Sequence, residues 1–186
     1  MRQETIIKTF LTFNELNEEQ QKKVLDNYHD INIDFNWYDS DIELFKSDLK
    51  ILGFRYIEIS FSGFSSQGDG ACFTALYSMP KNKKEVIKDF KNNNGCEKFL
   101  DIAERLLALN LDMNETYHLY SNNSRYCHEN TISCDNLELL EVCREYMRLI
   151  YKSLENQYYY LISNEAIKET LIANDYEFDI DTLKIG

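Results

Sequence analysis

The chain has 186 residues, and its 32 acidic against 20 basic residues give a net charge of −12. Hydrophobic residues make up 44% of the sequence, which excludes an intrinsically disordered chain. The surplus of carboxylates disfavours direct binding of DNA or RNA, because such a surface repels phosphate. The length predicts a single domain over residues 1–186, whose acidity serves either solubility alone or the binding of a basic partner.

The sequence shows no segment that directs it to a membrane or out of the cell. No run of about 18 apolar residues predicts a membrane-spanning helix, and charged residues interrupt the apolar residues near the N-terminus, unlike a signal peptide. The five cysteines form no C-x-x-C pair. We therefore expect free thiols in a cytoplasmic setting, with no metal and no other cofactor.

Helical periodicity comes first along the chain. Apolar residues at helical spacing predict one helix over about 15–28, begun by Asn14. A second helix is predicted over 37–52, and Gly53 stands where a left-handed residue often ends a helix. The period then changes to two in "RYIEISFSGF" and "ACFTALYS", which predicts a hairpin of two strands.

Helices and a second hairpin follow after the single proline. The segments 81–93 and 96–110 predict two more helices, and "ETYHLYS" and "RYCHENTIS" predict a second hairpin. A long helix is expected over about 136–158, and Ser163 is a plausible N-cap for a last one. The order predicts an α+β fold, in which two hairpins form an antiparallel sheet of about four strands, packed with about six helices.

The connection "SGFSSQGDG" of the first hairpin is longer than the usual two to five residues. Its Asp-Gly step is a turn signal, so the loop is interpretable as a wide turn alone. Ser65, Ser66, Gln67 and Asp69 nevertheless give it side chains that can bond a ligand or a protein partner. Neither G-K-[ST] nor G-x-S-x-G occurs there, so a nucleotide P-loop and a serine nucleophile elbow are not supported.

The segment "RYCHE" is the second candidate. On a strand, Tyr126 and His128 would share one face, opposite Glu129. If the two hairpins lie side by side, His128 and Asp69 could form an acid/base pair, although a lone strand histidine is more often packed or at the surface. An alternative ligand site therefore comprises Gln67, Asp69, Tyr126, His128 and Glu129.

Acidic and aromatic residues of the last third provide a possible docking surface. Glutamates line one stripe of the long helix, and tyrosines, which protein interfaces favour, follow at its end. The alternative for these groups is a solvated face and core packing. The residues predicted to contact a partner are Ser65, Ser66, Gln67, Asp69, Glu138, Glu141, Glu145, Tyr158 and Tyr159.

The strings "ISFSGFSSQGDGACF", "NWYDSDIELFKSDLKILGF", "RYCHE" and "YYYLISNEAIKETLIANDYEF" resemble a family of small acidic proteins of bacteriophages and prophages. Its members carry F-S-G-F-x-S-Q-G-D-G-A, often with Trp in place of Ser65, and some are labelled antitoxin-like. The resemblance implies a bacterial host cell.

By analogy with anti-CRISPR proteins, our leading hypothesis is an interaction protein without catalytic residues. It would occlude a basic surface of a bacterial CRISPR effector, toxin or other defence enzyme. The alternatives are a small-molecule or nucleotide-binding protein, or a hydrolase, at the ligand site above, and a structural role in the phage particle.

Overall fold

The computed structural model describes residues 8–93, 96–122 and 127–186. The chain divides into two compact units, a central unit of Tyr38–Glu155 and a terminal unit of Met1–Trp37 with Asn156–Gly186. Whether they fold together as one domain, as the length predicts, stays a prediction.

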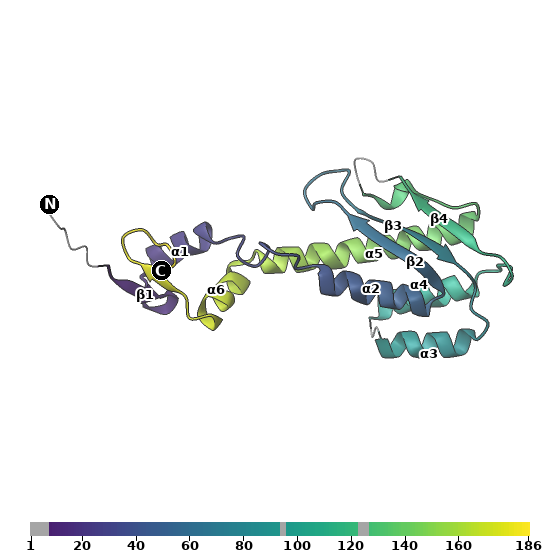
Figure 1. Ribbon diagram of the computed structural model, residues 1–186, viewed down its shortest axis with the longest axis horizontal. Helices are drawn as coiled ribbons and strands as arrows, with labels where there is room; N and C mark the ends of the chain where they lie inside the picture. The colour runs from purple at the N-terminus through teal and green to yellow at the C-terminus, as the bar shows by residue number, and fades with distance from the viewer. Residues whose placement is uncertain (1–7, 94–95, 123–126) are drawn as a thin grey trace, which may run out of the picture. The chain divides into compact units, whose positions relative to one another are not determined.

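The central unit contains a four-stranded antiparallel sheet in the order β2-β3-β4-β5 (Figure 1). Its strands are β2 (Phe54–Phe61), β3 (Ala71–Tyr77), β4 (Tyr117–Ser121) and β5 (Ile132–Ser133). The first two form the predicted hairpin, and β4 pairs with β3. The described residues contain six α-helices, so the predicted α+β class and its sheet are confirmed.

Four helices belong to the central unit wholly or in part: α2 (Asp39–Ile51), α3 (Lys83–Asn93), α4 (Glu97–Ala108) and α5 (Leu137–Leu161). Side chains from α2, α4 and α5 meet those of β2 and β3 around a core cavity of only about 10 Å³. The lining residues are apolar except for the Tyr146 hydroxyl, and they include Phe54, Phe73 and Leu106. These helices therefore cover one face of the sheet and bury the alternating apolar residues of its strands.

The end of α2 is fixed by Gly53, as predicted. Its φ of +103° lies in the region that side chains disfavour, and a Cβ there would lie 2.5 Å from the Ser78 carbonyl oxygen. The backbones of the two residues approach because the Ser78 N–H donates to the Gly53 carbonyl at 3.2 Å. Only glycine fits this turn into β2 without a shift.

The second predicted hairpin is shorter than expected. Glu129–Thr131 forms a 3₁₀-helix, and β5 holds only Ile132–Ser133. His128 causes the difference, because its Nδ1 accepts the Asn130 N–H at 3.1 Å and its carbonyl accepts the Thr131 N–H at 2.9 Å. Such local bonds compete with a strand ladder, so a strand through 129–131 was the wrong prediction. Tyr126 lies outside the described residues.

The terminal unit brings together both ends of the chain. It contains β1 (Phe10–Thr12), the 3₁₀-helix η1 (Phe13–Glu15), α1 (Glu18–Asn27), α6 (Asn164–Ala173) and β6 (Glu177–Asp179). β1 and β6 pair antiparallel, and Phe13, Val24, Ile167 and Phe178 are among its buried core. The sequence did not predict this second sheet.

The caps of the two terminal helices differ in how well they were predicted. Asn17 begins α1, with its side chain accepting the Gln20 N–H at 3.0 Å; the predicted cap, Asn14, lies in η1 instead. Ser163 caps α6 as predicted, because its hydroxyl accepts the Ala166 N–H at 3.3 Å.

Candidate functional site

The loop of residues 62–70, which joins β2 to β3, has a fixed base. The Phe61 ring contacts Tyr38 edge-on at 4.9 Å and stacks on Phe64 at 5.8 Å between ring centroids. Phe64 in turn contacts Tyr151 of α5 at 5.4 Å, and the Tyr151 hydroxyl donates to the Gly63 carbonyl at 2.9 Å. Aromatic contacts of this kind stabilise a structure beyond the area they bury. The loop is thus anchored to α5 and to Tyr38, the residue that precedes α2.

The tip of the same loop is braced from within by Asp69. Its Oδ2 accepts the backbone N–H of Ser66 at 2.7 Å and that of Ser65 at 3.0 Å. These bonds hold the turn while the side chains of Ser65, Ser66 and Gln67 stay exposed. The loop therefore presents three polar side chains from a braced backbone.

We expect the two hydrogen bonds that Asp69 accepts from the loop to be lost at low pH. The Ser66 N–H, and then that of Ser65, lower the pKa of Asp69 below its ordinary 3.8. A carboxylate whose pKa is lower in the folded than in the unfolded state stabilises the folded state at every pH above its unfolded-state pKa. This stabilisation is lost as the pH falls through the folded-state pKa. In an NMR titration, the Ser65 and Ser66 amide resonances should follow a midpoint below 3.8 in the wild type. The same resonances should not show this transition in Asp69→Asn, and a wild-type midpoint above 3.8 would contradict the brace.

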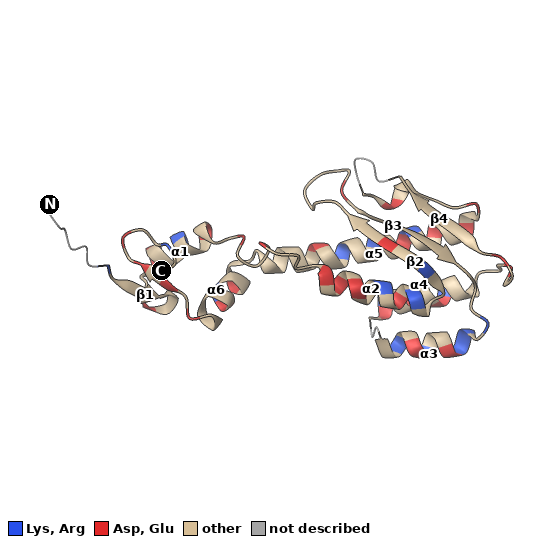
Figure 2. Ribbon diagram, viewed as in Figure 1, with Lys and Arg blue, Asp and Glu red and all other residues tan. Residues whose placement is uncertain are grey.

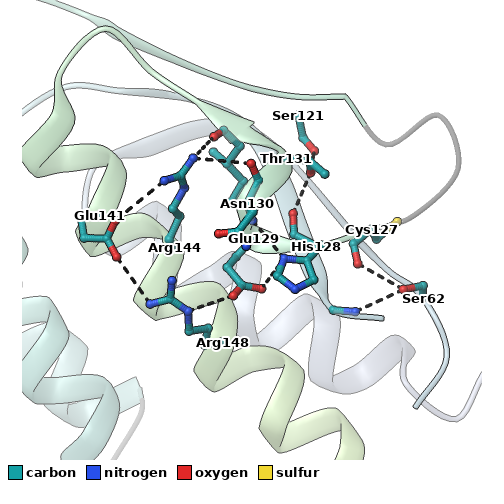
Figure 3. Close-up of polar contacts among 12 residues, drawn as sticks. Ser62, Ser121, Cys127, His128, Glu129, Asn130, Thr131, Glu141, Arg144 and Arg148 are labelled. Atoms are coloured by element: carbon teal, nitrogen blue, oxygen red, sulfur yellow. Dashed lines mark hydrogen bonds and ion pairs between the residues drawn. The ribbon is translucent and has the colours of Figure 1, made fainter. Parts of the chain in front are cut away.

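The two candidate segments of the sequence meet at this end of the sheet. Gly70 packs so closely on the second segment that a Cβ there would lie 3.0 Å from the His128 Cα and 3.2 Å from the Cys127 carbonyl oxygen. Ser62 also joins them, because its hydroxyl accepts the Gly70 N–H at 3.2 Å and donates to the Cys127 carbonyl at 3.1 Å (Figure 3). The loop and the segment of His128 therefore lie side by side, which is the condition on which an Asp69–His128 pair was considered.

A network of charged side chains holds the second segment (Figure 3). The Glu129 carboxylate, only 13% exposed, accepts from the Arg148 Nε at 2.9 Å and lies 3.0 Å from the His128 Nδ1. Arg148 also lies 3.6 Å from Glu141, and Arg144 donates to the Ile132 carbonyl at 3.0 Å. Both arginines project from α5, so this helix holds residues 129–132 as well as the base of the loop.

Truncating Glu129 should therefore weaken the central unit. Glu129→Ala leaves the Arg148 guanidinium without its nearest carboxylate, and we expect it to lower the free energy of unfolding by about 1–2 kcal/mol. The matched control is Glu138→Ala, which removes an exposed glutamate of α5, the helix that carries Arg148, and should change stability by less than about 0.5 kcal/mol. Urea denaturation measures both, and equal effects of the two variants would contradict a role for the network.

Asp69 and His128 do not act on each other in this arrangement. Asp69 accepts the loop N–H groups, whereas the His128 Nδ1 accepts the Asn130 N–H and lies 3.0 Å from the Glu129 carboxylate. The adjacent thiol is poorly suited to nucleophilic attack, because burial and then the neighbouring Cys72 raise the pKa of Cys127 to about 11. The geometry favours a contact surface over an acid/base pair.

The other predicted contact residues are distributed over both units. Two of the helix glutamates already have cationic partners: Glu145 accepts from Arg105 at 3.0 Å, and Glu141 pairs with Arg148. Glu138 is exposed. The predicted glutamate stripe is thus partly neutralised by arginines that were not predicted to pair with it. Arg105 is 40 residues away from Glu145 in the sequence, so the three- or four-residue spacing that signals an ion pair within a helix could not reveal that contact.

The predicted tyrosines belong to the terminal unit. Tyr158 packs against Trp37 at 6.1 Å, and Tyr159 is 51% exposed. This unit also carries the denser negative charge, with 13 acidic against 6 basic residues, compared with 19 against 14 in the larger central unit (Figure 2). The surplus of acid thus lies mainly outside the predicted helix stripe.

Comparison with known proteins places the central unit in a family. Residues 37–164 match the family described as a domain of unknown function (DUF8835). Since the match covers more than half of the sequence, the chain belongs to this family. The matched range includes the 62–70 loop and the charged network of α5. A search of curated proteins and a search of solved structures found no match.

None of the helices in residues 8–93, 96–122 and 127–186 has the length and apolar character needed to cross a bilayer. The same ranges contain no group of three or more His, Cys, Asp or Glu side chains that could hold a metal ion.

Proposed function

We propose that this protein is an acidic interaction protein, encoded by a phage or prophage, that inhibits a bacterial defence or nucleic-acid enzyme by occluding a basic surface. Its partner would be a CRISPR effector, a toxin or a similar basic protein of the host cytoplasm. The observation that carries the proposal is the 62–70 loop, whose base and tip are both fixed while Ser65, Ser66 and Gln67 are exposed.

The fixed conformation of this loop supports a role in binding. A loop that is already ordered loses less conformational freedom than a flexible one when a partner docks. A connection that only reverses the chain needs neither the Tyr151 hydrogen bond to Gly63 nor the aromatic contacts of Phe61 and Phe64. The exposed hydroxyl and amide groups can donate and accept hydrogen bonds, which suits recognition of polar groups on a protein surface.

The net charge of −12 supports a basic partner. Complementary charge accelerates encounter and suppresses wrong partners, and both effects decrease as salt screens the charges. The acidic terminal unit would add to this attraction without requiring a direct contact of each carboxylate.

A ligand-binding protein or hydrolase is the second candidate, favoured by the close packing of Gly70 on His128, where an added Cβ would lie 3.0 Å from the His128 Cα. That function requires Asp69 or His128 to contact the ligand. His128→Ala and Asp69→Ala would then abolish ligand binding while the fold persists. Under the leading proposal, His128→Ala leaves partner binding within about threefold of the wild type, a difference typical of residues at the edge of an interface.

Affinity capture from a bacterial lysate tests the leading proposal. The tagged full chain should retain a basic protein at about 0.05 M salt and lose most of it at about 0.5 M. The purified partner should lose its activity when the protein is added in equimolar amount. Capture of no stable partner, or of one whose activity is unaffected, would contradict the proposal.

A further inference from the structure

A second surface of the central unit has the opposite charge. Helix α3 carries four lysines against two carboxylates (Figure 2), in a protein whose overall charge is −12. In the part of the chain that the structure describes, Lys91 is the α3 lysine that lies within 4.0 Å of a carboxylate. Its Nζ is 3.8 Å from Glu104 of α4. The remaining lysines of α3 thus offer positive charge to another molecule.

These lysines border a groove of about 370 Å³ between α3 and α4. Lys83 and Lys84 line it on the α3 side, and Ile87, Leu107 and Ala108 supply apolar lining. Glu104 lines it on the α4 side, where Lys91 lies within ion-pair distance of its carboxylate. Leu107 is buried and Ile87 is half-buried, so apolar side chains form its floor and charged ones its edge. The small side chain of Ala108 allows another chain to approach closely.

The shape and chemistry of the groove indicate which kind of molecule can bind in it. Two helices of 11 and 12 residues lie side by side (Figure 1), and a third helix can pack into the groove between such a pair at about 8–10 Å between axes. An apolar floor requires apolar side chains on that helix, and the lysine edge requires carboxylates. A nucleic acid fits less well, because its backbone gains nothing from the apolar floor and the net charge repels it.

We propose that the α3–α4 groove docks an acidic amphipathic helix of a protein partner. Its apolar residues would contact Ile87 and Leu107, and its carboxylates would pair with Lys83 and Lys84. This surface is separate from the 62–70 loop, so the proposal does not depend on the proposed function. Together with the proposed function, it would let the protein join a basic partner at one surface to an acidic one at another.

A synthetic helical peptide tests this directly. The probe is an 18-residue peptide with leucines on one face and glutamates on the other, and the matched control peptide has lysine in place of each glutamate. In NMR titrations of the full chain, the acidic peptide should shift the Ile87, Leu107 and Ala108 resonances, and more weakly as salt increases. The lysine peptide should leave these resonances unchanged.

Reversing the charges of the two lysines that border the groove provides a second test. The double variant Lys83→Glu and Lys84→Glu should weaken peptide binding at least about tenfold. Lys22→Glu, an exposed lysine of the terminal unit, should leave it within about twofold. Equal binding of both peptides, or an undiminished affinity in the double variant, would overturn the proposal. So would displacement of the peptide by a single-stranded oligonucleotide, or a dimer of this chain that the double variant abolishes.

Discussion

Gly53→Ala is expected to lower the free energy of unfolding by about 3–5 kcal/mol, combining backbone strain with a steric clash. The φ of +103° lies outside the regions that alanine adopts readily, and the new methyl group would meet the Ser78 carbonyl oxygen at 2.5 Å. That oxygen belongs to the backbone and cannot rotate away. The nearby Pro80 ring, at 3.3 Å, further limits relaxation.

Gly63→Ala is the matched control for this prediction. A Cβ at Gly63 would make an ordinary contact at 3.5 Å with the Asp69 carboxylate, so we expect a change below about 1 kcal/mol. Guanidinium denaturation followed by circular dichroism measures both variants. If Gly53→Ala proved as stable as Gly63→Ala, the turn that joins α2 to β2 would not have the conformation described.

Replacing the tip of the 62–70 loop should weaken partner binding by about 100-fold or more, because a central contact would be lost and repulsion added. The variant is Ser66→Lys with Gln67→Lys, which places two positive charges against a basic surface. Both residues are exposed, and the Asp69 bond to Ser66 uses the backbone N–H. The loop should therefore keep its conformation.

A charge-matched variant separates this contact from a general electrostatic effect. Met113→Lys with Asn114→Lys adds the same charge at exposed positions of the α4–β4 connection. That connection precedes Tyr117, which pairs with Tyr77 at the far end of β3 from the loop. Calorimetric titration against the captured partner should show a loss below about tenfold for this control. Equal losses in both variants would exclude the loop as the contact.

The sequence predicted the central unit well where local signals agree. The change from helical to strand periodicity after Gly53 marks a boundary that the structure contains. The tight turn of the loop lies at Gln67–Gly68 and not at Asp69-Gly70, because the Asp69 N–H donates to the Ser66 carbonyl at 3.0 Å. The sequence failed at His128–Thr131, because the His128 side chain accepts the Asn130 N–H and the His128 carbonyl accepts the Thr131 N–H, two groups that a strand would use. The β1–β6 pair was missed because its strands have three residues each and lie at opposite ends of the chain.

The sequence singled out the residues proposed as a site, but it did not reveal the contacts that hold them in place. Ser65, Ser66, Gln67 and Asp69 stand in one contiguous string, so composition alone singled them out. Their anchor, Tyr151, lies 88 residues from Gly63 in sequence, and periodicity alone cannot reveal such a contact. Likewise, Arg148 could be placed on α5, but not opposite Glu129, until the path of residues 127–131 was known.

Hydrogen exchange measured by mass spectrometry, on the protein alone and bound to its captured partner, tests the central claim most directly. If the 62–70 loop is the contact element, peptides covering residues 63–69 should become protected in the complex, most strongly at the amides of Ser65, Ser66 and Gln67. A complex that forms and inhibits the partner while exchange in 63–69 stays unchanged would contradict the account.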